Sequence, residues 1–130
     1  PKGARVWLFA GLADGGFARS REFPALSGVE SLVIADADGD GQADLLLLSP
    51  SEKLIGLSRW KDDRLDYPET IHQSTDPLTA VFAGDFRGGP CVIALEEKKP
   101  QPSLSLFRWQ AATKPWKIER LDLPGAPGLV

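Results

Sequence analysis

The sequence predicts an all-β protein made of short antiparallel strands grouped in four-stranded units. Three observations lead to this fold class. Short apolar runs are bounded by Gly, Pro, Asp or Ser. No stretch has the apolar spacing of a helix. The 130 residues include 13 glycines and 11 prolines, a share that in a chain with 42% hydrophobic residues fits many tight turns.

A pattern recurs along the chain at a spacing of 49 residues. "VESLVIAD" (29–36) aligns without a gap on "LTAVFAGD" (78–85), so that Val33 meets Phe82. "KLIGLSRW" (53–60) aligns on "SLSLFRW" (103–109), and "RVWLF" (5–9) falls about one period earlier. Four-stranded units at a period of about 40 to 50 residues are typical of the blades of a β-propeller.

The middle unit is predicted to have strands at about 29–35, 44–48, 54–60 and 64–71. The first two are almost continuously apolar, which predicts burial on both faces. The last two mix polar and apolar residues, so we expect them to be solvent-facing outer strands.

The whole chain, 1–130, is interpreted as one propeller segment of about two and a half blades: a partial blade at 1–26 and full blades at 27–76 and 77–126. "PGLV" (127–130) would begin another blade. Because propellers need about four to eight blades to close, further blades in the same chain or in other copies are expected. The alternative is a β-sandwich of about ten strands, which is less favoured because sandwiches rarely repeat at blade length.

Composition argues against several classes of partner. A formal net charge of -3 and a pI of about 5.1 leave no surplus of positive charge for nucleic acid. The apolar runs are far shorter than the roughly 20 residues that cross a bilayer, so no membrane insertion is expected. The single cysteine, Cys91, excludes an internal disulfide and is expected to be a small core residue.

"DADGDGQAD" (36–44) concentrates carboxylates in one turn, with no Lys or Arg among its residues. Counted from Asp36, acids occupy positions 1, 3, 5 and 9, and Gly41 stands at the sharp turn. Oxygen ligands on a turning backbone suit Ca²⁺ better than Mg²⁺ or zinc. An EF-hand is excluded because its twelfth position would be Leu47. The alternative is a plain acidic turn.

The same nine residues resemble the DxDxDGxxD loop of the FG-GAP or VCBS repeat, the blade unit of integrin-alpha-like propellers. The resemblance covers the chain as a repeat pattern, although the specific motif occurs once. It implies four side-chain ligands and one main-chain ligand of Ca²⁺: Asp36, Asp38, Asp40 and Asp44, with the carbonyl of Gln42. The corresponding stretch of the next repeat is "GDFRGGPCV" (84–92). It keeps Asp85 but has Arg87 and Gly89 at the positions of the next two acids. No calcium is expected there, and Arg87 would pair with Asp85.

The function that follows is a non-catalytic, calcium-binding propeller segment for protein or glycan interaction. Weak calcium sites fill outside the cytosol, which favours a secreted, cell-surface or periplasmic protein. One alternative is a lectin-like module in which Trp60 or Trp109 stacks on a sugar; packing within the fold is the competing role for both. Another is an accessory propeller of a carbohydrate-active enzyme. No catalytic residue is predicted, and His72 is expected on the surface.

Overall fold

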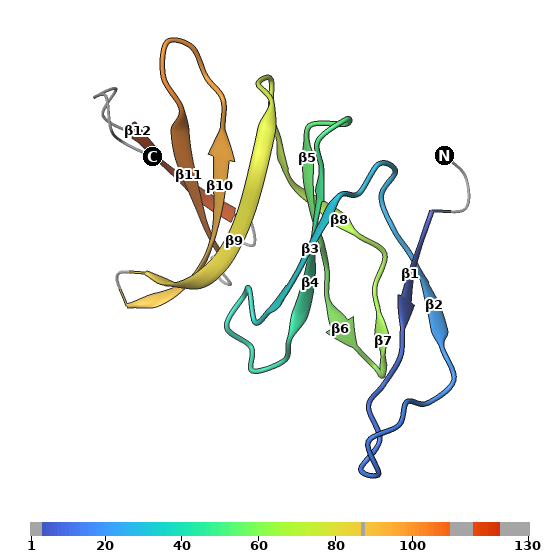
Figure 1. Ribbon diagram of the computed structural model, residues 1–130. Helices are drawn as coiled ribbons and strands as arrows, with labels where there is room; N and C mark the ends of the chain where they lie inside the picture. Colours follow the sequence, from blue (N-terminus) through green and yellow to red (C-terminus); the bar gives the residue numbers. More distant parts are fainter. Residues whose placement is uncertain (1–3, 87, 110–115, 123–130) are drawn as a thin grey trace.

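The structure is a computed structural model that describes residues 4–86, 88–109 and 116–122 (Figure 1). These residues form strands joined by turns, without a helix, and so contain no helix able to span a membrane. The strands are β1 (Arg5–Leu8), β2 (Arg21–Pro24), β3 (Ser31–Ala35), β4 (Asp44–Ser49), β5 (Leu54–Ser58), β6 (Trp60–Lys61), β7 (Arg64–Leu65), β8 (Glu69–Gln73), β9 (Leu78–Phe86), β10 (Gly89–Glu96), β11 (Ser103–Trp109) and β12 (Trp116–Asp122).

Two of the sheets have four strands each, and all pairings are antiparallel. The middle sheet has the order β3-β4-β5-β8, and the third sheet has the order β9-β10-β11-β12. A first sheet consists of β1 and β2, and β6 and β7 form a small hairpin. Figure 1 shows the sheets side by side along the chain, without closure into a ring. The all-β, four-stranded antiparallel prediction is confirmed, and the number of blades stays a prediction.

The two four-stranded sheets share a register as well as a strand order. In each sheet one row of paired residues crosses the first three strands. This row is Val33, Leu46 and Leu57 in the middle sheet, and Phe82, Ile93 and Leu106 in the third. The first and last members of each row lie 49 residues apart, whereas the second members lie 47 apart. The chain from Phe82 to its partner Ile93 is therefore two residues shorter than the chain from Val33 to its partner Leu46.

Strand β4 is buried on both faces, as its run of four leucines predicted. Leu46 and Leu48 face the third sheet, and Leu45 and Leu47 face the first. The larger core cluster between the middle and third sheets is Ala37, Leu46, Leu48, Ile55, Leu57, Ile71, Leu78, Val81, Val92, Ala94 and Phe107. Burial of one such aliphatic side chain contributes about 1.5 to 3 kcal/mol to folding, so face-to-face contact between sheets is a major source of stability.

The prediction that β3 is buried on both faces is wrong. Val33 packs against the larger core cluster, but Leu32 and Ile34 on the opposite face are 52% and 75% exposed. The cause is the small size of the first sheet. Phe23 of its two strands packs on β4, whereas Leu32 and Ile34 of β3 face β1 across an open pocket.

The predicted outer strands also differ from the structure. β5 is buried along most of its length, because the third sheet packs on the face of Ile55 and Leu57 and the Leu26 side chain lies against Gly56 on the other. It ends at Ser58, and the predicted fourth strand is divided into β7 and β8. Pro68 lies in the interruption. Because proline has no backbone N–H, it cannot donate a hydrogen bond to a neighbouring strand.

Candidate metal centre

The aspartate loop connects β3 to β4 at one end of the middle sheet. Asp36 directly follows β3, and Asp44 begins β4, where it pairs with Ala35. The β-ladder therefore brings the first and last acids of the motif together. Gly39 and Gly41 have φ values of 78° and 88°, a region that favours glycine, so their lack of a Cβ allows the tight turn.

The four carboxylates converge on one small volume. One oxygen from each of Asp36, Asp38, Asp40 and Asp44 lies within 4.8 Å of the others. Ligands on opposite sides of a Ca²⁺ ion, each at about 2.3 to 2.6 Å, are about 4.6 to 5.2 Å apart. The spread of these oxygens thus fits a single hard cation with oxygen ligands.

Asp36 organises the turn through the backbone. Its carboxylate accepts hydrogen bonds from the amides of Gly39 (2.9 Å), Asp40 (3.1 Å) and Gly41 (2.9 Å). Desolvation raises the pKa of Asp36, but these amide bonds outweigh it and hold the pKa below its ordinary value. This carboxylate is therefore ionised and fixed in the loop at neutral pH.

Asp44 is the buried member of the cluster, with 1% of its surface exposed. Its Oδ2 accepts a hydrogen bond from the amide of Ala37 at 3.2 Å, whereas Oδ1 is buried and has no hydrogen-bond partner of normal geometry among the described residues. Burial and the nearby charges of Asp38 and Asp40 raise the pKa of Asp44 to about 6, with smaller opposing effects from the backbone amides of Ala37 and Trp60. A cation beside Oδ1 would relieve both its burial and the repulsion.

Asp40 and Gln42 lie on the open side of the loop. The Asp40 carboxylate is exposed and accepts a hydrogen bond from the amide of Gln42 at 2.8 Å. The amide of Asp40 in turn bonds to Asp36 and, at 3.2 Å, to Asp38. The Gln42 residue is thus held at the site, and coordination through its carbonyl stays a prediction.

Arg59 is a partner of the loop that the sequence interpretation missed. Its Nε donates to Asp38 Oδ2 at 3.0 Å, and the Asp38 side chain is only 6% exposed. The acids are therefore accompanied by an arginine, although none occurs within residues 36–44. The pairing of β4 with β5 explains the contact: Ser58 pairs with Leu45, so the next residue, Arg59, lies beside Asp44 at the same end of the sheet.

The corresponding turn of the third sheet uses different contacts. Asp85 lies in β9, is exposed and pairs with Pro90. Arg108 donates to the backbone carbonyls of Phe86 and, at 3.3 Å, Gly89. Among the described residues, the aspartates of the loop at 36–44 are the one group of acids close enough to share a cation. Arg87 lies outside the described residues, and so does its predicted pair with Asp85.

Trp60 and Trp109 both make packing contacts within the fold. Trp60 meets Phe23 edge-on at a centroid distance of 6.1 Å, and Trp109 meets Trp116 at 5.4 Å. Both indoles are half-buried. These contacts give each tryptophan a structural role, and stacking on a ligand stays a prediction.

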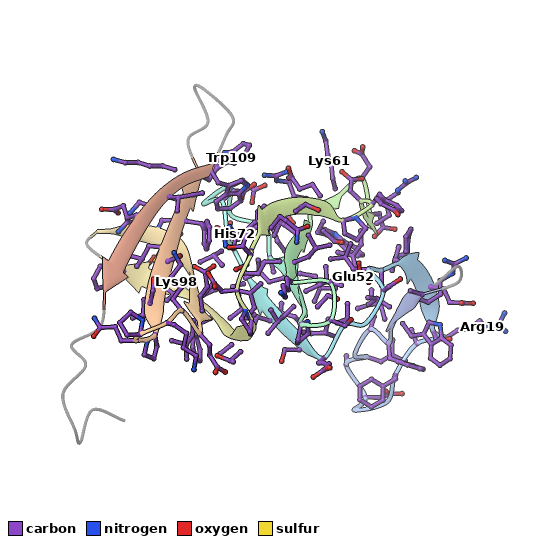
Figure 2. The ribbon with its side chains drawn as sticks, turned by 90° about the horizontal axis from the view of Figure 1, so that it is seen from above. Arg19, Glu52, Lys61, His72, Lys98 and Trp109 are labelled. Carbon is purple, nitrogen blue, oxygen red and sulfur yellow. The ribbon has the colours of Figure 1, made fainter. Side chains whose placement is uncertain are left out.

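The prediction of a surface histidine at position 72 is wrong. His72 lies in β8 between the two four-stranded sheets and is 8% exposed (Figure 2). Its Nε2 is 3.1 Å from Glu96 Oε2, which also accepts a hydrogen bond from the Ser74 hydroxyl at 2.6 Å. Serine and histidine thus share a carboxylate rather than bond to each other, which is not the arrangement of an activated nucleophile. Glu96 is the buried last residue of β10.

No protein-family model, curated protein or solved structure matches the chain. The function is therefore argued from the site, because fold class alone does not specify function.

Proposed function

We propose that the loop at 36–44 binds Ca²⁺ and that the chain is a non-catalytic segment of a β-propeller of the FG-GAP or VCBS kind, which presents its loops to a protein or glycan. One observation carries the metal proposal. Asp44 Oδ1 is buried without a hydrogen-bond partner of normal geometry, inside a cluster of three further carboxylates. A buried unpaired carboxylate oxygen is costly, and a bound cation would satisfy it.

The ligand atoms of the cluster are carboxylate oxygens, which suit a hard cation such as Ca²⁺ better than a softer metal ion such as zinc. Asp36, Asp38, Asp40 and Asp44 would supply carboxylate oxygens, and no histidine or cysteine belongs to the described cluster. Bound calcium would neutralise the clustered charge and fix the turn that joins two core strands. The role of the metal in this proposal is structural.

The expected affinity is that of an extracellular module, with a dissociation constant of roughly 0.1 to 1 mM. At ~1 mM Ca²⁺, binding at this strength stabilises the folded state by about 0.4 to 1.4 kcal/mol. Such a site would be filled outside the cytosol, which is the basis for proposing a secreted, cell-surface or periplasmic protein.

Packing of the middle sheet supports the propeller part of the proposal. Its β4 leucines alternate between a cluster shared with the first sheet and one shared with the third. Sheets stacked face to face in chain order, each a four-stranded antiparallel unit, are the building plan of propeller blades. A β-sandwich consists of two packed sheets, whereas here the middle sheet packs against the third sheet on one face and the first sheet on the other.

Calorimetric titration of Ca²⁺ into chelator-treated protein tests the metal proposal. We expect one site, loss of binding in Asp44→Asn and Asp38→Ala, and retained binding in Asp85→Asn, the matched change in the turn of the third sheet. Two sites, or unchanged binding in Asp44→Asn, would contradict the assignment.

A lectin-like role is the second candidate, and a pocket beside the loop favours it. The other residues that line this open pocket with Trp60 are charged or polar: Asp40, Gln42, Arg59, Lys61, Asp62 and Asp63. An indole among hydrogen-bonding groups is the chemistry of sugar recognition. A glycan array probed with wild type and Trp60→Ala tests it, and equal binding by both proteins would exclude this pocket.

A further inference from the structure

The guanidinium of Arg59 joins the aspartate loop to two other parts of the fold. It donates to Asp38, forms a second ion pair with Glu69 in β8, and lies over the ring of Trp109 with its Cζ at 4.4 Å from the ring centroid. Burial alone would lower the pKa of Arg59, but the bonds and charges of Asp38 and Glu69 outweigh this and raise it. A permanent positive charge therefore lies against one of the four carboxylates.

The equivalent arginine of the third sheet supports a general role for this position. Arg108 stands 49 residues after Arg59, and it also reaches the connection between the first two strands of its own sheet. There the described acids do not form a cluster, and the guanidinium binds the carbonyls of Phe86 and Gly89 directly. In both sheets, an arginine at the end of the third strand thus provides a positive charge to this turn.

We propose that Arg59 is a built-in counter-cation of the aspartate loop, that it competes with Ca²⁺ for Asp38, and that it thereby sets the affinity of the site. This inference rests on the proposed calcium function. Its physical basis is that Asp38 Oδ2 carries the Arg59 bond, so full coordination by Asp38 must displace or weaken that bond. The positive charge also repels an incoming divalent ion.

Glu69 and Trp109 determine what happens to Arg59 when the metal binds. Both remain available to the guanidinium, one through an ion pair and the other through a cation–π contact. Arg59 can therefore take an alternative position in which it contacts Glu69 of β8 and Trp109 of the third sheet. Calcium binding and contact between the two sheets are coupled through this one side chain.

Calcium titration of charge variants tests the proposal. Arg59→Met removes the competing charge, and we expect the dissociation constant to fall by about tenfold, which corresponds to the tenfold step of about 1.4 kcal/mol. Glu69→Gln frees the guanidinium for Asp38, so we expect binding to weaken by about threefold, which is about half of that step. Arg5→Met is the matched control, because it removes an exposed arginine paired with Glu22 in the first sheet.

Each outcome bears on the proposal. Equal or weaker binding in Arg59→Met overturns it, since weaker binding would show that Arg59 positions Asp38 for the metal. If neither wild type nor Arg59→Met binds Ca²⁺, the proposed function fails as well; if both bind equally, only the competition fails. Should Arg59→Met not fold, the exposed Glu69→Gln variant and the NMR signal of the Arg59 Nε–H carry the test. That signal must move during titration of wild type, and a stationary signal overturns the proposal.

Discussion

The imidazole Nε2 of His72 lies 3.1 Å from Oε2 of Glu96 and connects two sheets through a buried carboxylate. The hydroxyls of Ser74 and Ser105 each donate to the same carboxylate at 2.6 Å. Burial raises the pKa of Glu96, but the bonds from Ser105, Ser74 and His72 outweigh it and lower the pKa to about 2. The contact between the middle and third sheets therefore includes an ionised, hydrogen-bonded group within a mainly apolar interface.

Glu96→Gln is expected to change the response of the protein to acid. The folded-state pKa lies below the ordinary value of 4.5, so Glu96 contributes stability above about pH 4.5 and loses it as the pH falls toward 2. The full shift would correspond to at most about 3 kcal/mol. In urea unfolding between pH 5 and pH 2, the variant should lose less stability than wild type. The neighbouring exposed Glu97→Gln is the control, and parallel curves for wild type and Glu96→Gln would refute the prediction.

Asp44→Asn is expected to stabilise the metal-free protein at neutral pH. Because the folded-state pKa of about 6 exceeds the ordinary 3.8, the ionised side chain opposes folding above pH 6, and this cost disappears as the pH falls toward 4. An amide avoids that cost and can donate to the neighbouring carboxylates. We expect a gain of about 1 to 2 kcal/mol in excess chelator, together with loss of the calcium response. Thermal melting measures both, with the exposed Asp85→Asn in the third sheet as control; a lower melting temperature of Asp44→Asn in chelator would contradict the expectation.

Leu46→Ala and Leu47→Ala test whether β4 is packed on both faces. Each leucine is fully buried, one against the third sheet and the other against the first. We expect each substitution to cost about 2 to 5 kcal/mol in denaturant unfolding. Ile34→Ala, at a side chain 75% exposed, should cost less than about 0.5 kcal/mol. A small effect at either leucine would mean that the sheet facing it is not packed there.

Gly41→Ala is expected to destabilise the folded protein through the backbone alone. A Cβ at this position would meet no atom within 4 Å, but φ is +88°. The substitution should therefore cost about 1 kcal/mol of loop strain without a clash. Gly11→Ala is the matched control, since it also has open space and its φ is not in the positive range. Denaturant unfolding should show the first variant about 1 kcal/mol less stable than wild type and the second unchanged, and equal stability of both variants would contradict the expectation.

The features predicted correctly depend on residues close together in sequence. The leucine run of β4 predicts a strand covered on both faces, and four acids spaced over nine residues predict a loop in which their oxygens meet. The glycine at position 41 predicts a sharp turn, and its φ of 88° fits such a turn. In each case local spacing and backbone geometry determine the outcome.

The features that were missed depend on neighbours distant in sequence. Arg59 is 21 residues from Asp38 and reaches it only because β4 and β5 pair. His72 looks like a polar loop residue, yet β8 extends through it and Glu96 provides a buried partner. The exposure of Ile34 follows from how few strands the first sheet contains, a property that the residues around position 34 do not encode.

The uncovered face of β3 has a practical consequence for work with this polypeptide. Among the described strands, β1 pairs with β2 alone, so its other edge offers free backbone donors and acceptors close to Leu32 and Ile34. An unpaired strand edge beside exposed apolar side chains is a template for strand pairing between molecules. Purified 130-residue material should therefore show concentration-dependent growth in light scattering, and mild detergent should suppress it.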